Sequence, residues 1–198
     1  MNHASFVAHF KKSDPTIAAL LIKFGEYEIP QQEDYFNALI RAIVSQQVSV
    51  KAAQSVFEKL VARYNGILDP GILAKSTQEE LRECGISRQK YSYIVDLSEN
   101  FMNQTELFQE LANMRNEEVI TALTSVKGIG VWTAQMFLMF TLGRLDVFPV
   151  DDLAIRTAMA NEFGFERDEV KKERYHKLSE PWTPYRSVAC WYLWKSLH

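Results

Sequence analysis

Apolar side chains recur every three or four residues along most of the chain, the spacing that places them on one face of an α-helix. The clearest segment spans residues 35–64, where this spacing continues on both sides of a polar stretch at 45–49. That stretch predicts two helices with a break between them. Because no alternating strand pattern longer than four residues stands out, the sequence predicts an all-α fold.

Capping residues predict where several helices begin. Asp14 stands before Pro15, and an aspartate followed by a proline is typical of a helix start, so a helix is expected through Phe24. Ser76 is expected to cap a helix over 77–84, with Glu79 completing a capping box. Further helices are expected to begin at the Asp69-Pro70 pair, after an Asn116 cap, and over 88–103, 131–142, 153–163 and 184–197.

A turn with the sequence Lys127-Gly128-Ile129-Gly130 separates two of these helical patterns. Its two glycines permit positive φ angles and a close approach of another backbone. The helix that follows presents unpaired N–H groups and the positive end of its dipole, which together favour an anion. The turn is therefore a candidate phosphate site, although a tight corner between two helices has the same composition.

A pair of carboxylates, Asp151-Asp152, opens the helix expected over 153–163. A fixed carboxylate stabilises positive charge that develops in a transition state. Aspartates at a helix start are also common N-caps. From the residues alone either aspartate could carry the chemistry, or both could be caps.

Composition narrows the function classes. The net charge of −3 and the pI of about 5.9 count against a generic basic nucleic-acid binder, but they allow backbone N–H groups to grip phosphates. Cys84 and Cys190 are too few for a four-thiolate iron–sulfur site and are expected to be buried free thiols of a reducing cytosol. The histidines show no metal-ligand spacing, the N-terminus has no apolar signal core, and no run approaches the length of a membrane span.

Two motifs carry a resemblance to a known family. The pattern Leu-x-x-Val-Lys-Gly-Ile-Gly-x-Trp-Thr-Ala from residue 123, followed by Asp-Val-Phe-Pro-Val-Asp-Asp at 146–152, resembles the helix-hairpin-helix–GPD superfamily of DNA glycosylases. The most similar branch is that of 3-methyladenine DNA glycosylase II. Segments 42–49, 84–90 and 184–189 agree with it, so the resemblance covers roughly residues 6–198.

The resemblance implies a two-lobed helical fold with the active cleft between the lobes. One lobe would comprise residues 1–30 and 145–198. The other would comprise residues 31–144, including the helix-hairpin-helix at about 117–142. The implied enzyme excises alkylated purines of the 3-methyladenine type from double-stranded DNA by hydrolysing the N-glycosidic bond.

Asp152 matches the catalytic aspartate of the superfamily, with Asp151 and Asp146 left as structural residues. Bifunctional relatives carry a nucleophilic lysine directly before Thr-Ala, where this chain has Trp132. An indole cannot form a Schiff base, so the resemblance implies a monofunctional enzyme without lyase activity. The base pocket would be lined by Trp132, Met136, Leu153 and Trp194, which favours electron-poor cationic bases. Met136 and Leu153 replace aromatic residues of the best-known relative, which leaves the substrate range open.

The resemblance also assigns contacts to DNA. Gln47 matches the side chain that fills the gap left by a flipped base, although glutamines at a helix break could simply cap it. The hairpin residues Lys127, Gly128, Ile129 and Gly130 would bind a phosphate. Arg88 and Lys90 would hold further phosphates, unless they are solvated surface charges. The carbonyl groups of Thr124, Val126 and Ile129 are expected to chelate Na⁺ or K⁺.

The sequence thus predicts an enzyme that requires no cofactor, has no iron–sulfur cluster or membrane partner, and acts as a monomer. We expect it in the cytoplasm of a bacterium, associated with DNA, or in a eukaryotic nucleus. Three alternatives stay open: a glycosylase for an oxidised or mismatched base, a non-catalytic DNA-binding module, and a structural helical adaptor.

Overall fold

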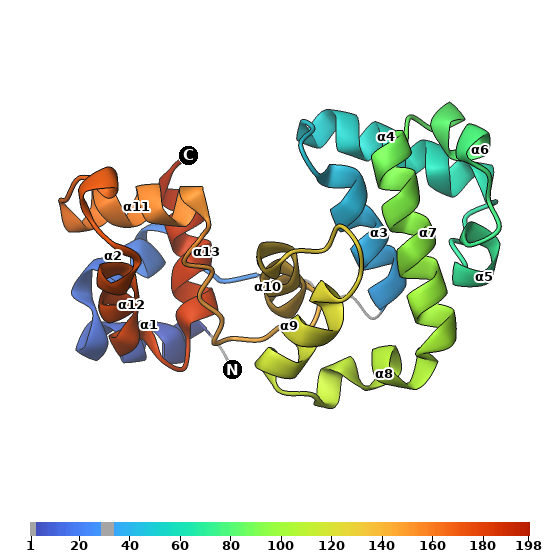
Figure 1. Ribbon diagram of the computed structural model, residues 1–198. Coiled ribbons are helices and arrows are strands. Elements are labelled where there is room, and N and C mark those ends of the chain that lie inside the picture. Colours follow the sequence, from blue (N-terminus) through green and yellow to red (C-terminus); the bar gives the residue numbers. More distant parts are fainter. Residues whose placement is uncertain (1–2, 29–33) are drawn as a thin grey trace. The chain divides into compact units, whose positions relative to one another are not determined.

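The computed structural model describes residues 3–28 and 34–198, and every regular element in these two ranges is an α-helix or a 3₁₀ helix (Figure 1). The chain divides into two compact units, which are described separately. The first unit comprises Met1–Gln31 and Leu138–His198, and the second comprises Gln32–Phe137. The all-α prediction is confirmed. Among the described helices, none combines the length and apolar character needed to cross a bilayer.

The first unit joins the two ends of the chain. Its helices are α1 (His3–Ser13), α2 (Pro15–Phe24), α11 (Leu153–Phe163), α12 (Lys172–Ser179) and α13 (Arg186–Ser196), with 3₁₀ turns η2 (Arg167–Glu169) and η3 (Glu180–Trp182). Helix α13 packs against both α2 and α11, so it forms the centre of this unit. The Asp14 cap also accepts a buried hydrogen bond of 2.7 Å from Nε1 of Trp182, which ties α2 to η3.

The second unit is organised around one long helix, α7 (Arg88–Asn103), which packs against α3, α5, α6 and α8 (Figure 1). Its other elements are α3 (Tyr35–Ser45), α4 (Val50–Arg63), α5 (Pro70–Leu73), α6 (Gln78–Glu83), α8 (Thr105–Gln109), η1 (Glu110–Asn113) and α9 (Asn116–Thr124). Helix α10 (Val131–Phe140) starts in this unit and ends in the first, because the division falls after Phe137.

Several predicted boundaries are confirmed. Helix α3 ends at Ser45 and α4 begins at Val50, so the polar stretch at 45–49 is the expected break. Asp14, Asp69 and Asp152 are N-caps whose side chains accept backbone N–H groups. The lobe limits expected from the resemblance stay a prediction, and the limit at residues 30 and 31 lies outside the described residues.

The prediction that Ser76 caps a helix was wrong, and the structure shows why. Thr77 caps α6, and its partner in the capping box is Glu80 rather than Glu79. The hydroxyl of Ser76 is engaged elsewhere, since it accepts from the hydroxyl of Tyr64 at 2.6 Å and donates to the carbonyl of Ile72.

Three other helix limits also differ from the prediction. Arg115 precedes α9 and donates its backbone N–H to the carboxylate of Glu118, whereas Asn116 is the first helical residue. Helix α10 ends at Phe140 rather than 142, and α13 spans Arg186–Ser196 rather than 184–197. Helices α1, α8 and α12 were not predicted. In α12 only Tyr175 and Ser179 are buried, which leaves little apolar periodicity to detect.

Candidate functional site

The glycine turn forms a hairpin between α9 and α10. The N–H of Val126 donates to the carbonyl of Leu123, and the N–H of Ile129 donates to the carbonyl of Val126, each at 3.1 Å. Helix α10 then opens with a bond from the N–H of Ala134 to the carbonyl of Gly130. The expected helix-hairpin-helix is therefore present as a local structure.

The two glycines of the hairpin differ in their surroundings. Gly128 has a φ angle of +83°, and a Cβ built on it would lie 2.2 Å from the ring of Tyr93 on α7. A Cβ built on Gly130 meets no atom within 4 Å. The fold therefore requires Gly128, whereas Gly130 leaves open space where another molecule could approach.

Two side chains from other elements hold the hairpin peptides. Oδ2 of Asp96 on α7 accepts the backbone N–H of Lys127 at 2.7 Å. Nε2 of Gln46 donates to the carbonyl of Gly128 at 2.9 Å. The side chain of Lys127 itself is exposed. Because the Lys127 N–H is engaged by a carboxylate, the predicted phosphate contact depends on the later groups of the turn and on the lysine side chain.

The loop between α3 and α4 presents Gln47 to solvent. Gln47 has a φ angle of +55°, a left-handed conformation that is uncommon for a residue other than glycine. Its neighbours Val48 and Val50 are 46% and 88% exposed, although both are apolar. Ser49 caps α4 by accepting the N–H of Ala52. Gln47 is thus exposed and is followed by two exposed valines. Its insertion into a duplex stays a prediction.

The two cations proposed for phosphate binding differ in their surroundings. Arg88 is exposed in the first turn of α7. Lys90 is half-buried, its Nζ donates to the carbonyl of Val44 at 2.6 Å, and burial lowers the pKa of its ammonium group. Lys90 therefore has a structural task at the end of α3, and contact of either cation with DNA stays a prediction.

Asp152 is buried in the first unit, as Asp14 also is, with 7% of its surface exposed. Its Oδ1 accepts the N–H of Ile155 at 2.8 Å, which makes it the N-cap of α11. The same oxygen accepts Nε1 of Trp194 on α13 at 3.1 Å. The carboxylate is therefore fixed in orientation by donors from two helices.

The two neighbouring carboxylates occupy different environments. Asp151 is exposed and forms an ion pair with Lys172. Asp146 forms a two-pronged ion pair with Arg186, with N···O distances of 2.6 and 2.8 Å. Burial raises the pKa of Asp146, but the hydrogen bonds and charge of Arg186 outweigh this and hold it below the ordinary value. Both have cations as partners, which suits structural roles.

The four residues expected to line the base pocket are divided between the units. Trp132 and Met136 lie on the part of α10 in the second unit, and Trp132 is 47% exposed. Leu153 and Trp194 lie in the first unit, where Leu153 is 61% exposed and the ring of Trp194 is tilted against Phe140 at 5.7 Å. The base pocket therefore stays a prediction.

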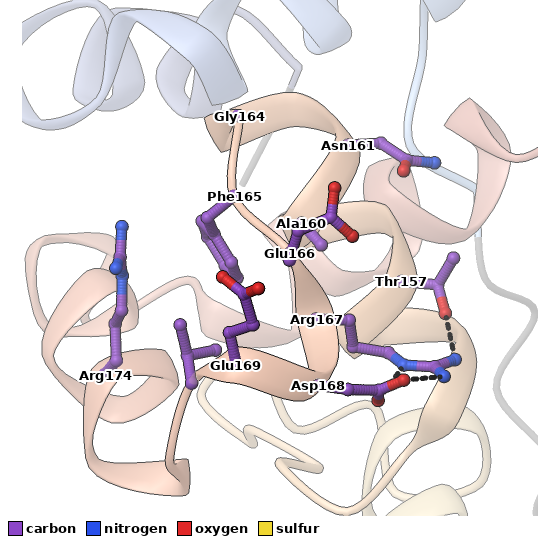
Figure 2. A pocket seen from close by; sticks show the side chains of 11 residues that line it. Thr157, Ala160, Asn161, Gly164, Phe165, Glu166, Arg167, Asp168, Glu169 and Arg174 are labelled. Carbon is purple, nitrogen blue, oxygen red and sulfur yellow. Dashed lines mark hydrogen bonds and ion pairs between the residues drawn. The ribbon is translucent and has the colours of Figure 1, made fainter.

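A depression of about 830 Å³ lies on another side of α11 (Figure 2). Thr157, Ala160 and Asn161 line it together with residues 164–170 and Arg174. Arg167 there is bonded to both Asp168 and Thr157. Neither Asp152 nor Trp194 lines this depression, so it is separate from the candidate active site.

Both cysteines are buried free thiols, as predicted. Burial raises the pKa of Cys190, and the negative charge of Asp152 adds to this effect.

In the hairpin, the carbonyl of Val126 proposed for the cation already accepts one hydrogen bond, which leaves its second lone pair for a ligand. The cation site stays a prediction.

Some residues of these sites were not found from the sequence. Gln46, Tyr93 and Asp96 shape the hairpin from loops and helices far along the chain, with Asp96 31 residues before Lys127. No local pattern distinguishes such residues from ordinary surface positions.

Comparisons with known proteins agree with this fold. Residues 40–184 match the family described as HhH-GPD superfamily base excision DNA repair protein. The chain is 32% identical over 193 residues to the alkylbase DNA glycosidase-like protein mag2 of Schizosaccharomyces pombe, covering 94% of this chain and 90% of that one.

Two solved structures are similar over almost the whole chain. DNA-3-methyladenine glycosidase from Bacillus halodurans has a TM-score of 0.84 and 34% identity, with 96% of this chain and 88% of that chain covered. The 3-methyladenine DNA glycosylase Mag1 of S. pombe, in complex with abasic DNA, has a TM-score of 0.83 and 32% identity, with 97% and 96% covered.

The chain belongs to the HhH-GPD superfamily of base excision DNA repair proteins. It is a DNA glycosylase with the two-lobed helical architecture of that superfamily.

Proposed function

We propose that this glycosylase hydrolyses the N-glycosidic bond of alkylated purines of the 3-methyladenine type in double-stranded DNA, with Asp152 as the catalytic carboxylate. The observation that carries the proposal is the setting of Asp152, which is buried and oriented by the N–H of Ile155 and the indole of Trp194. The names of the similar proteins support the substrate class.

The chemistry requires an anion fixed near the sugar. When the bond between C1′ and the base nitrogen breaks, positive charge develops on the deoxyribose, and a preorganised carboxylate stabilises it. The same carboxylate can orient or deprotonate the water that attacks C1′. Alkylation at N3 or N7 makes the purine cationic and a better leaving group, so the pocket needs no strong general acid.

The reaction would end at an abasic site without strand cleavage. Strand cleavage by a bifunctional enzyme requires an amine that forms a Schiff base with the sugar. Trp132 occupies the position of that lysine, and Lys127 lies at a different position, inside the hairpin. Both features support a monofunctional enzyme.

DNA would be held by the second unit. Gly128, Ile129 and Gly130 would bind a phosphate, assisted by Lys127 and a Na⁺ or K⁺ ion on the carbonyl groups of the hairpin. Gln47 would fill the gap left by the flipped base, and Arg88 would add a phosphate contact. The enzyme would act as a monomer on DNA, in the cytoplasm of a bacterium or in a eukaryotic nucleus.

Release of methylated bases from duplex DNA tests the proposal. The wild type should release 3-methyladenine and leave abasic sites that break only after treatment with alkali. Asp152→Asn should release little base, and Asp151→Asn is the matched control, because its carboxylate is exposed and paired with Lys172. Comparable loss in both variants, or in neither, would reject the role of Asp152.

The same assay separates the alternatives. Release of an oxidised or mismatched base, but not of methylated purines, would make this a glycosylase for another lesion.

A further inference from the structure

Two segments of the second unit that the proposed function brings to DNA are joined directly. The loop after α3 carries Gln47, and the hairpin after α9 carries the phosphate-binding turn. A hydrogen bond of 2.9 Å from Nε2 of Gln46 to the carbonyl of Gly128 links them across 82 residues of sequence. The contact is partly buried, so it is partly shielded from competing water.

The hairpin end of this link is firmly held. The ring of Tyr93 lies against Gly128, and Asp96 accepts the N–H of Lys127 at 2.7 Å. Both residues project from α7, the helix around which the unit is packed. The carbonyl group of Gly128, which accepts the bond from Gln46, is therefore part of a turn that is held in place by α7.

The loop end is held as well, up to the residue before Gln47. The N–H of Gln46 donates to the carbonyl of Ile43 at 3.3 Å as α3 ends, and Lys90 donates to the carbonyl of Val44. Gln47 follows at once in its left-handed conformation, with its side chain exposed. The position of Gln47 is thus set by a neighbour that is bonded to the hairpin.

We propose that Gln46 is a positioning residue that fixes the distance between the phosphate held by the hairpin and the duplex gap filled by Gln47. This inference rests on the proposed function. A primary amide suits the task, because it donates to the carbonyl of Gly128 and stays neutral beside a polyanion. Without the bond, Gln47 would still be present but would no longer enter the stack at a fixed depth.

The role predicts a loss confined to duplex substrates, because a single strand has no gap to fill. Gln46→Ala should slow base release from duplex DNA by about 10- to 100-fold, the range that small misplacements of catalytic geometry produce, and leave release from single strands nearly unchanged. Gln46→Glu should lose at least as much, since its carboxylate would face a carbonyl oxygen as a second acceptor.

A double-mutant cycle tests whether Gln46 acts through Gln47. Single-turnover rates on duplex and single-stranded DNA are compared for the wild type, Gln46→Ala, Gln47→Ala and the double variant. If Gln46 positions Gln47, the double variant loses no more than Gln47→Ala alone. Independent losses that multiply in the double variant, or equal losses on both substrates, would overturn the proposal.

A second measurement keeps the test independent of catalysis. The affinities of the same four proteins are measured for a duplex and for a single strand that carry a stable abasic-site analogue. Gln46→Ala should weaken duplex binding only while Gln47 is present. A wild type without glycosylase activity would reject the proposed function, whereas an additive binding cycle would reject the role of Gln46.

Gln104→Ala is the matched control. Gln104 is exposed and follows the last residue of α7, and its amide donates to Oδ1 of Asn100 on the same helix at 2.8 Å. Gln104→Ala should leave unchanged the ratio of the rates on duplex and single-stranded DNA, and likewise the ratio of the two affinities. Thermal unfolding of each variant identifies any general loss of structure. Such a loss would lower the rates on duplex and on single-stranded DNA alike and would count against a positioning role.

Discussion

Trp194 and Ile155 donate to the same oxygen of Asp152, at 3.1 and 2.8 Å, from helices α13 and α11. A carboxylate held by two donors on one oxygen cannot rotate without breaking both bonds. The aromatic residue expected in the base pocket therefore also has a second task, which is to orient the candidate catalytic group.

Replacing Trp194 by phenylalanine should separate these two tasks. The aromatic ring is largely kept, but the donor to Asp152 is lost. Since hydrogen bonds to charged groups contribute about 1.5–3 kcal/mol, the rate of base release should fall by roughly tenfold or more on both duplex and single-stranded DNA. Trp191→Phe is the control, because Trp191 contacts Tyr27 and Lys195. An unchanged rate in Trp194→Phe would remove the orienting role.

Asp152 has a capping role and a candidate catalytic role, and two substitutions distinguish them. Asparagine is also a good N-cap, so Asp152→Asn should keep its stability while base release falls on the order of 10²–10³-fold. Asp152→Ala loses the cap of α11 and should also lose about 1 kcal/mol of stability. Urea unfolding and single-turnover kinetics measure the two effects. Near-wild-type release by the asparagine variant would rule out catalysis by this carboxylate.

The glycines of the hairpin should respond oppositely to alanine. Gly128→Ala adds both left-handed strain, about 1–2 kcal/mol, and a collision with the ring of Tyr93, so its stability should fall. Gly130→Ala should keep its melting temperature and instead weaken DNA binding, because its Cβ fills open space beside the start of α10. Binding titrations with duplex DNA and thermal unfolding check the pair. If Gly130→Ala binds as the wild type does, no phosphate approaches there.

The ion pair between Asp146 and Arg186 should make stability depend on pH. The pKa of Asp146 is held below its ordinary value of 3.8, so the pair stabilises the fold above that pH and this stabilisation is lost as the pH falls through the lowered pKa. The stability difference between wild type and Asp146→Asn should therefore be present at pH 7 and shrink in acid. Urea unfolding at several pH values measures it, and a constant difference would contradict the assignment.

Gln47→Ala should weaken base release from duplex DNA more than from single strands. Keeping a stack open costs roughly a few kcal/mol, and only the duplex requires it. The ratio of the two rates cancels effects on the base pocket, which both substrates share. An unchanged ratio would return Gln47 to the role of a residue at a helix break.

The parts of this fold that could be predicted are those that depend on contacts between residues close together in the sequence. Asp14, Asp69 and Asp152 each bond to N–H groups two or three residues ahead, so their capping roles are visible in the sequence. Ser76 and Thr77 show the limit of this reasoning, since each stands three residues before a glutamate. The choice between them is made by Tyr64 and Ile72, which engage the hydroxyl of Ser76.

The candidate site shows the same division. The position of Asp152 after the hairpin could be read from the chain, but the indole that orients it comes from 42 residues further on. The supports of the hairpin, Tyr93 and Asp96, lie on a helix whose surface residues carry no periodic signal for this contact. Contacts between distant segments depend on packing, which no local pattern contains.

The contact between Tyr93 and Gly128 has an evolutionary consequence. Two separate constraints act on position 128, the ring and the left-handed backbone, whereas only the ring depends on position 93. Substitution of Tyr93 by a smaller residue would remove the collision but not the strain, so it would not free position 128 to change. Related sequences should therefore vary at position 93 while they keep glycine at 128, with asparagine as the rare exception where the residue at position 93 is small.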